Sequence, residues 1–318
     1  MFSAIEGHGD SIVSYQKAIA LREMKTIKTL QNVPKQMPMI YGPEPLYQPS
    51  SAKKLAALEY YLRILEPLLL PDESALTQGY LWHDNLHHEN IFVDPETLLI
   101  VGIIDCQSIQ VAPLFDHCLD LCFLDYDGPD VGDNLGRPEL PESVKSLEGK
   151  EKDRAIRQFL DKGVMVGWRS LFRNRMPTHY PSIQFQQSTR GNLLHLSRRI
   201  FELGEAHFHA LLLDLQDEWN HVRTANSSTP CFPLKFSEPQ ISTIEADMRR
   251  ADLGIEIMNT MVKRRLGDLW PEKGVIEVEN YEKVKTVLRE VKADLIDRYC
   301  CHQGWDTALF ERLWPFDD

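Results

Sequence analysis

The stretch from Tyr80 to Asp105, YLWHDNLHHENIFVDPETLLIVGIID, constrains the fold of this chain more than any other part of the sequence. It begins with apolar residues and continues into a polar loop that contains His83, His87 and Asn90. A short run of β-branched and aromatic residues follows, and a second apolar run ends in Asp105. This order of apolar and polar segments predicts a strand, a loop, a strand, a turn and a further strand.

The segment Pro95–Thr97 has the composition of a turn, so we expect the strands on either side of it to form a β-hairpin. Such a hairpin would bring the Asn90 amide and the Asp105 carboxylate together. Both groups offer the hard oxygen ligands that Mg²⁺ prefers, and phosphoryl transfer uses Mg²⁺ to offset charge on the phosphate oxygens. The alternative is structural, with an amide at the end of a hairpin and an aspartate that caps the next turn. The spacing and the flanking strands favour the magnesium site.

The histidines of the loop raise the alternative of a zinc site. His83 and His87 straddle a loop rather than one face of a helix, and the sequence contains no HExxH motif. We therefore expect their imidazoles to hydrogen-bond the loop backbone, and we expect His88 to face solvent.

The quoted segment resembles the aminoglycoside phosphotransferase and choline kinase superfamily, whose loop commonly has the pattern H-G-D-L-H-x-x-N and whose metal strand has I-D-W or I-D-C. The stretches LWH-x-x-LH-x-x-NIFVD, GIID-x-Q, APLF, LDYDGP and LYQPSS resemble more narrowly its fungal branch, altered inheritance of mitochondria protein 9. The resemblance implies a role for each matching residue: His83 and His87 as the two loop histidines, Asn85 at the catalytic Asp position, Asn90 and Asp105 as metal ligands, and Asp116 as a brace for the loop. Cys106 stands where the fungal branch usually has Trp.

The resemblance implies ATP-dependent phosphoryl transfer to a small-molecule hydroxyl, with Mg²⁺ and ATP as cofactors. Asn85 departs from the family pattern, because an amide can orient a hydroxyl but cannot take its proton near neutral pH. The adjacent Asp84 is a poor substitute, because neighbouring side chains in an extended loop point in opposite directions. We therefore expect an impaired or inactive enzyme. The alternative is a non-catalytic, pseudokinase-like scaffold that binds a protein partner through an exposed apolar face.

The N-terminal part of the chain predicts helices rather than a β-rich nucleotide-binding lobe. Apolar residues recur with a helical period in Ser14–Gln31 and in Ser51–Leu70, and the proline-rich stretch 34–49 separates them. Neither a glycine-rich turn between strands nor a lysine on a β-branched strand precedes His83. We therefore expect a truncated enzyme in which residues 1–50 form a helix and linker, and residues 51–318 form the phosphotransferase lobe with its catalytic segment at 80–116.

Beyond Asp105 the pattern turns helical. The predicted helices there are Asp116–Leu124, Leu140–Arg173, Leu193–Arg223, Glu238–Leu269 and Glu279–His302. The predicted fold class is thus α+β and predominantly helical, and the resemblance implies the C-terminal lobe of a protein-kinase-like fold with a small β-hairpin that carries the site.

Composition limits the partners and the location. A net charge of −12 argues against nucleic-acid binding, and no apolar run reaches membrane-spanning length. Met1–Ser14 contains acidic residues and no apolar core, so we expect neither a signal peptide nor an Arg-rich transit peptide. The six cysteines form no CxxC pair, which favours a reducing compartment. The fungal branch implies a mitochondrial location; without that resemblance we would expect a cytoplasmic protein.

Overall fold

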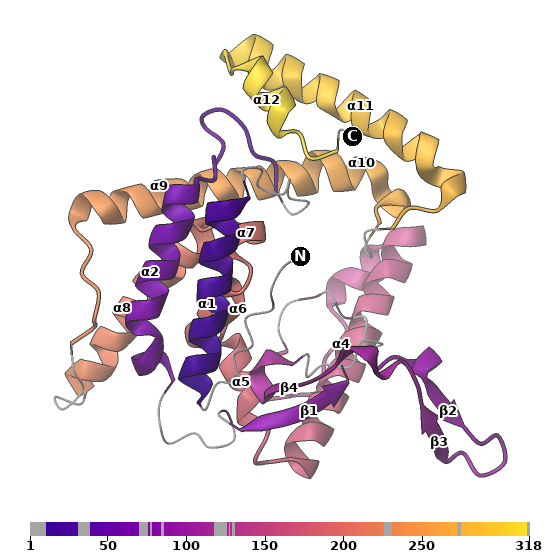
Figure 1. Cartoon of the computed structure of the whole chain (residues 1–318). Helices are drawn as coiled ribbons and strands as arrows, with labels where there is room; N and C mark the ends of the chain where they lie inside the picture. Colours follow the sequence, from indigo (N-terminus) through magenta and orange to yellow (C-terminus); the bar gives the residue numbers. More distant parts are fainter. Residues whose placement is uncertain are drawn as a thin grey trace. The chain divides into compact units, whose positions relative to one another are not determined.

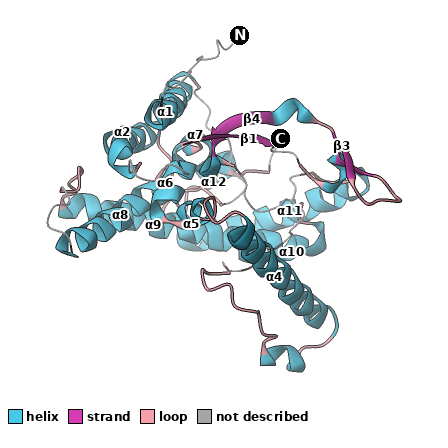
Figure 2. Cartoon of the chain, turned by 90° about the horizontal axis from the view of Figure 1, so that it is seen from below, coloured by secondary structure: helices cyan, strands magenta, loops and turns pink. Residues whose placement is uncertain are grey.

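The computed structural model describes residues 11–30, 39–69, 76, 78–83, 86–117, 126, 128, 131–225, 231–271 and 275–316. Across these residues the protein is predominantly helical, with small antiparallel sheets (Figures 1 and 2). The predicted fold class, α+β with mostly helix, is therefore confirmed at this level. None of the described helices combines the length and the apolar composition that crossing a lipid bilayer requires.

The described residues divide into two compact units. Unit 1 holds Val13–Leu68 and residues 193–316, and unit 2 holds Leu69–Asn192. The boundary predicted at residue 50 falls inside the first continuous segment of unit 1. This segment packs with helices from the second half of the chain, contacts that local sequence patterns do not reveal.

Unit 1 is built from helices. Its elements are α1 (Ile12–Thr29), α2 (Ser51–Leu68), α7 (Ile200–Leu203), α8 (Ala206–Ala225), α9 (Glu238–Ile257), α10 (Arg264–Leu266), α11 (Tyr281–Leu295) and α12 (Thr307–Leu313), and α6 (Thr189–Ser197) joins it to unit 2. The predicted helices at Ser14–Gln31 and Ser51–Leu70 correspond to α1 and α2. The helix predicted at Leu193–Arg223 is instead broken into α6, α7 and α8. The second of these two breaks lies at Gly204, whose φ of 82° places it outside the helical region.

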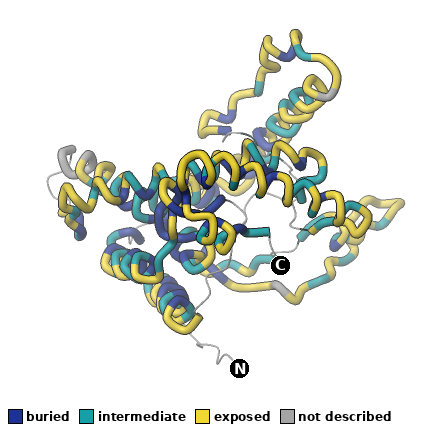
Figure 3. The backbone as a smooth tube through the Cα atoms, turned by 90° about the horizontal axis from the view of Figure 1, so that it is seen from above, coloured by how far each residue is buried: buried dark blue, intermediate teal, exposed yellow. Residues whose placement is uncertain are grey.

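The buried faces of α1 and α2 follow from their apolar periodicity. In α2 the buried positions recur every three or four residues, at Lys54, Ala57, Leu58, Tyr61, Ile64, Leu65 and Leu68. The burial colours of Figure 3 show the same alternation of buried and exposed stretches along the helices. α1 lies beside α2 (Figure 1), and the Tyr61 hydroxyl of α2 donates a hydrogen bond to Gln16 Oε1 of α1 at 3.1 Å.

The long α9 has a defined start. Ser237 forms a capping box with Gln240, whose side-chain oxygen accepts hydrogen bonds from the Ser237 backbone N–H at 2.9 Å and from its hydroxyl at 3.0 Å. Pro239 in the first turn suits a position that needs no backbone donor. At its other end α9 continues through a π-helical turn, Met258–Lys263, into α10. This run corresponds to the helix predicted at Glu238–Leu269.

A polar cluster lies inside unit 1, which we call the Glu205 cluster (Glu23, Tyr47, Lys54 and Glu205). Glu205 Oε1 accepts hydrogen bonds from the Tyr47 hydroxyl at 2.5 Å and from the Ser50 backbone N–H at 3.1 Å. Lys54 Nζ donates to the Phe201 carbonyl at 2.6 Å, and Glu23 Oε2 accepts from the Phe201 N–H at 3.1 Å. Burial raises the pKa of Glu205 and lowers the pKa of Lys54, because both charged forms lose water.

Unit 2 contains the strands. β1 (Gly79–His83) pairs antiparallel with β4 (Ile109–Pro113), so that Gly79 lies opposite Pro113 and His83 lies opposite Ile109. β2 (Ile91–Val93) and β3 (Ile100–Ile103) form a separate antiparallel hairpin. The expectation that the chain turns helical directly after Asp105 was wrong, because β4 lies there and has its partner thirty residues upstream, beyond the reach of local periodicity.

The helices of unit 2 are α4 (Gly149–Arg175) and α5 (Pro181–Gln187). α4 begins nine residues later than predicted, because a separate 3₁₀ turn occupies Glu142–Ser146. A 3₁₀ turn also occupies Leu114–Asp116, and most of the helix predicted at Asp116–Leu124 lies outside the described residues. The core of this unit gathers Leu114, Val131, Leu135, Met165, Val166, Phe172, Tyr180 and Ile183.

Candidate functional site

The predicted turn between the two hairpin strands is held by one aspartate. Asp94 Oδ1 accepts hydrogen bonds from the Thr97 N–H at 2.7 Å, the Thr97 hydroxyl at 2.9 Å and the Glu96 N–H at 3.0 Å. These bonds, the one from the Thr97 backbone above all, lower the pKa of Asp94. This aspartate-centred turn lets β2 and β3 pair with Ile91 opposite Ile103. The predicted turn at Pro95–Thr97 and the predicted hairpin are confirmed.

The pairing brings the two predicted metal ligands together. Asn90 ends a 3₁₀ turn directly before β2, and Asp105 follows β3, with Nδ2 of Asn90 lying 3.4 Å from Oδ2 of Asp105. Asn90 is 7% exposed, so its amide is held among other groups rather than in solvent. The same Nδ2 lies 3.2 Å from Nε2 of His87. An amide, a carboxylate and an imidazole thus meet at the open ends of the hairpin.

His83 fixes the position of the residue before Asp105. Its Nε2 lies 2.9 Å from the Ile104 carbonyl oxygen, and since a carbonyl only accepts, this nitrogen is the donor. The Ile104 N–H in turn donates to the Asn90 carbonyl at 3.0 Å. Ile104 is therefore held from both sides, once by the end of β1 and once by Asn90. The expectation that loop imidazoles hydrogen-bond backbone is confirmed for His83, and His88 is exposed as predicted.

Asp105 has an unusual backbone conformation. Its φ of 62° and ψ of 44° lie in the left-handed region, which residues with a Cβ rarely adopt and which Asp and Asn tolerate best. The chain then turns into a 3₁₀ turn at Cys106–Ser108 before it enters β4. Left-handed backbone at non-glycine residues is concentrated at functional sites, where surrounding structure holds it in place.

The donor set at the hairpin suits Mg²⁺. That ion usually takes one or two protein oxygen ligands and completes its octahedron with water and substrate phosphates. Rotating the Asn90 amide by half a turn would present its oxygen beside the Asp105 carboxylate, with His87 Nε2–H as its donor. Within the described ranges, no three His, Cys, Asp or Glu side chains gather as a metal-binding group. The described residues thus provide no cage of the kind that a structural zinc uses.

The predicted roles of Asn85 and Asp116 are not tested by the structure. Asn85, like Asp84, lies outside the described residues, so its predicted place beside the reacting hydroxyl stays a prediction. Asp116 is half-buried at the end of its 3₁₀ turn. The carbonyls of its neighbours Phe115 and His117 accept hydrogen bonds from Gln186 Nε2 at 2.8 Å and 2.6 Å. Its predicted role as a brace for the loop stays a prediction.

His117 lies beside the site but was not predicted from the sequence. This residue is 1% exposed, and its Nε2 lies 3.2 Å from the Tyr80 carbonyl of β1 and 3.1 Å from the Ala112 carbonyl of β4. Its ring stacks on Trp82 with the ring centres 5.2 Å apart. His117 therefore ties together the two strands that flank the site. A histidine directly after Asp116 was the available signal, but its partners come from strands that the sequence did not pair.

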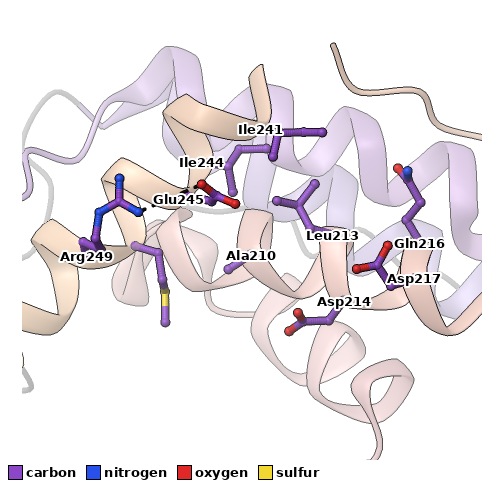
Figure 4. Close-up of a pocket in the computed structure, with 10 residues that line it drawn as sticks. Ala210, Leu213, Asp214, Gln216, Asp217, Ile241, Ile244, Glu245 and Arg249 are labelled. Atoms are coloured by element: carbon purple, nitrogen blue, oxygen red, sulfur yellow. Dashed lines mark ion pairs between the residues drawn. The ribbon is translucent and has the colours of Figure 1, made fainter. Parts of the chain in front are cut away.

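Unit 1 carries a cleft of ≈ 400 Å³ between α8 and α9 (Figure 4). Its lining combines apolar side chains, among them Leu213, Ile241 and Ile244, with several charged ones, Asp214, Asp217, Glu245 and Arg249. Glu245 and Arg249 lie 4.0 Å apart as an ion pair. The cleft contains none of the predicted site residues.

Comparison of the chain with family models, with curated proteins and with solved structures gives no match. A functional assignment therefore depends on the geometry at the hairpin and on the resemblance carried by the segment from Tyr80 to Asp105.

Proposed function

We propose that this protein is a protein-kinase-like phosphotransferase that uses Mg²⁺ and ATP to phosphorylate a hydroxyl group of a small molecule. The observation that carries this proposal is the meeting of the Asn90 amide and the Asp105 carboxylate at 3.4 Å, across a hairpin that separates them by fifteen positions. We further propose that its chemical step is slow, because Asn85 stands where the superfamily has its catalytic aspartate.

Each residue at the hairpin has a proposed part in binding and positioning. Asp105 and the Asn90 oxygen would hold Mg²⁺, which offsets charge on the phosphate oxygens when it is bound. His87 would orient the Asn90 amide, and His83 would keep Asp105 in place through the Ile104 carbonyl, to which it is bonded at 2.9 Å. These contacts of His83 and His87 matter because a metal-ligating side chain that is free to rotate binds the metal less well.

Asn85 limits the chemistry that this site can perform. An amide oxygen can accept the hydrogen bond of an acceptor hydroxyl and orient it, but it cannot remove the proton. General-base help contributes about 10²–10⁴-fold to such reactions. We therefore expect Asn85→Asp to raise ATP turnover by a factor in about this range, and unchanged turnover would show that another defect limits the reaction.

Binding of nucleotide and metal is the first test. We expect ATP with Mn²⁺ or Mg²⁺ to raise the melting temperature of the protein, and EDTA to remove the effect. Asp105→Asn keeps a residue that tolerates left-handed backbone but removes the charge, so it should abolish the shift while leaving the fold intact. Asp94→Asn, on the same hairpin but in the turn, is the matched control and should keep it. A shift that survives Asp105→Asn would disprove the metal site.

A second candidate function is a non-catalytic scaffold, and a specific observation favours it. The hairpin and its neighbouring strands expose large apolar side chains, among them Leu81, Leu98, Leu99, Ile100, Val101 and Val111. Exposed apolar surface of this kind is typical of protein-binding sites. This function predicts a partner from a cell extract whose binding is insensitive to EDTA and to Asp105→Asn, and is lost with Val101→Lys. Nucleotide-dependent capture would instead favour the phosphotransferase.

A further inference from the structure

A cleft of ≈ 290 Å³ lies in unit 1 between α2, α8 and the start of α9. Its walls combine aromatic, charged and aliphatic side chains, chiefly Lys53, Tyr60, His209, Phe236, Ile244 and Asp247. It contains none of the residues of the hairpin site. A ligand of this cleft would therefore be independent of the function proposed for the hairpin site.

His209, which lines one wall of the cleft, has a buried ring nitrogen. His209 Nε2 is buried and has no hydrogen-bond partner among the described residues. Burial lowers the pKa of His209 to about 4, so the imidazole is neutral near pH 7. Buried polar atoms normally have hydrogen-bond partners, and an exception beside a cleft is a place where a ligand can supply the missing one.

Aromatic rings line the cleft beside His209. The Tyr60 ring meets the His209 ring edge to face with centres 6.0 Å apart, and meets the Phe236 ring with centres 5.5 Å apart. Ala56, Pro239 and Ile244 add aliphatic surface. Walls of this kind favour a flat apolar body, because an aromatic ring packs well against other rings at these separations.

The charges at the cleft disfavour organic cations as ligands. Lys53 forms an ion pair with Asp247, and Arg250 Nη1 also lies 3.3 Å from Asp247 Oδ1, so the carboxylate is already neutralised. An organic cation would meet two positive groups around one negative group and would gain little. The Lys53 ammonium has further N–H donors for an oxygen atom of a ligand.

We propose that this cleft binds a small phenol, with its ring against Tyr60 and Phe236 and its hydroxyl hydrogen-bonded to His209 Nε2. A hydroxyl suits this nitrogen because it both donates and accepts, and so it pairs with either tautomer of the imidazole. The volume of the cleft suits one ring or two fused rings.

The test uses two ligands on the full chain, 2-naphthol and 2-methylnaphthalene, which share the ring system and differ in the hydroxyl. We expect 2-naphthol to bind about tenfold more tightly, the effect of one hydrogen bond to an otherwise unpaired buried group. His209→Phe keeps an aromatic ring but removes the nitrogen, so it should bring the two affinities together. Equal affinities for the unchanged protein, a preference that survives His209→Phe, or no binding of 2-naphthol would overturn the proposal.

Two further variants keep the test decisive if His209→Phe does not fold by circular dichroism. Ala56→Phe fills the cleft from α2 and should abolish the binding of both ligands. Leu213→Trp, in the neighbouring cleft of Figure 4, should leave both affinities unchanged. Binding that survives Ala56→Phe, or is lost with Leu213→Trp, would place the ligand elsewhere and refute the proposed site.

Discussion

The Glu205 cluster of unit 1 and the β2–β3 hairpin of unit 2 arrange polar and apolar groups in opposite ways. In unit 1, the carboxylate of Glu205 and the ammonium of Lys54 belong to residues that are both 0% exposed. In the hairpin, Val101 is 68% exposed while the polar Asn90 is 7% exposed. The first region buries charge inside a helical core, and the second exposes aliphatic side chains around a small polar centre.

The difference shows that the two regions are stabilised by different means. The Glu205 cluster depends on hydrogen bonds whose donors and acceptors come from distant parts of the chain, Tyr47, Ser50 and Phe201. The hairpin depends on one turn and one short ladder, and an isolated two-stranded hairpin is only marginally stable in water. Substitutions should therefore have large, global effects in the first region and small, local effects in the second.

The largest expected effect comes from removing the carboxylate of the cluster. Glu205→Ala leaves the Tyr47 hydroxyl and the Ser50 N–H without their acceptor and removes a negative charge from the surroundings of Lys54. Breaking such a buried set by deleting one member costs about 3–5 kcal/mol. Urea unfolding followed by circular dichroism measures this loss in the free energy of unfolding.

Glu205→Gln is the matched control for that experiment. The amide oxygen can still accept from Tyr47 and Ser50, and the raised pKa of Glu205 indicates that its negative charge costs desolvation energy. We expect a clearly smaller loss than for alanine. Equal losses for the two variants would mean that the charge, rather than the hydrogen bonds, stabilises this region.

The next effect concerns pH. The folded pKa of His209 is about 4, against an ordinary value of 6.5, so between these values the unfolded chain binds more protons than the folded chain. Stability from this group therefore rises with pH across that window and is lost as pH falls toward 4. Glu23 and Glu205 act with the opposite sign, because burial raises their pKa values.

Comparison with His209→Gln separates these contributions, because glutamine does not titrate. The stability of the unchanged protein relative to this variant should fall by roughly 2 kcal/mol between pH 6.5 and pH 4. Denaturant unfolding at a series of pH values measures the difference. A constant difference across the series would show that the pKa of His209 is the same in the folded and the unfolded chain, which would contradict this prediction.

The smallest effect should come from the hairpin. Leu98 has a φ of 57° and is 77% exposed, so its side chain gains little packing while its backbone is strained. Leu98→Asn should stabilise the hairpin by about 0.5–1 kcal/mol, since asparagine tolerates left-handed backbone. Slower hydrogen exchange of the paired residues of β2 and β3 measures the gain. Leu99→Asn, at an exposed neighbour without positive φ, should bring none.

Local patterns in the sequence predicted those parts of the fold that local forces determine. The alternation in residues 91–104 and the turn at Pro95–Thr97 predicted the hairpin, and helical periodicity predicted α1, α2 and much of α9. The proximity of Asn90 and Asp105 was predicted from the hairpin, because pairing of the strands brings their ends close together. The structure confirms this proximity, whereas the binding of metal there stays a prediction.

The features that the sequence did not predict depend on long-range contacts. The pairing of β1 with β4 and the bridging role of His117 join residues about thirty positions apart, and no local period encodes such a pair. The Glu205 cluster was also missed, because a glutamate and a lysine in amphipathic helices are normally solvated. The left-handed conformation of Asp105 has no signal in the sequence beyond the tolerance of aspartate for it.

The pairing of His83 with Ile109 has a consequence for how this region can change. Because His83 and Ile109 are partners in the β1–β4 ladder, the chain between them begins and ends at neighbouring positions of the sheet. A longer or shorter segment could therefore replace residues 84–108 while the pairing of β1 with β4 is kept. The proposed site and the strands that carry it can thus diversify independently.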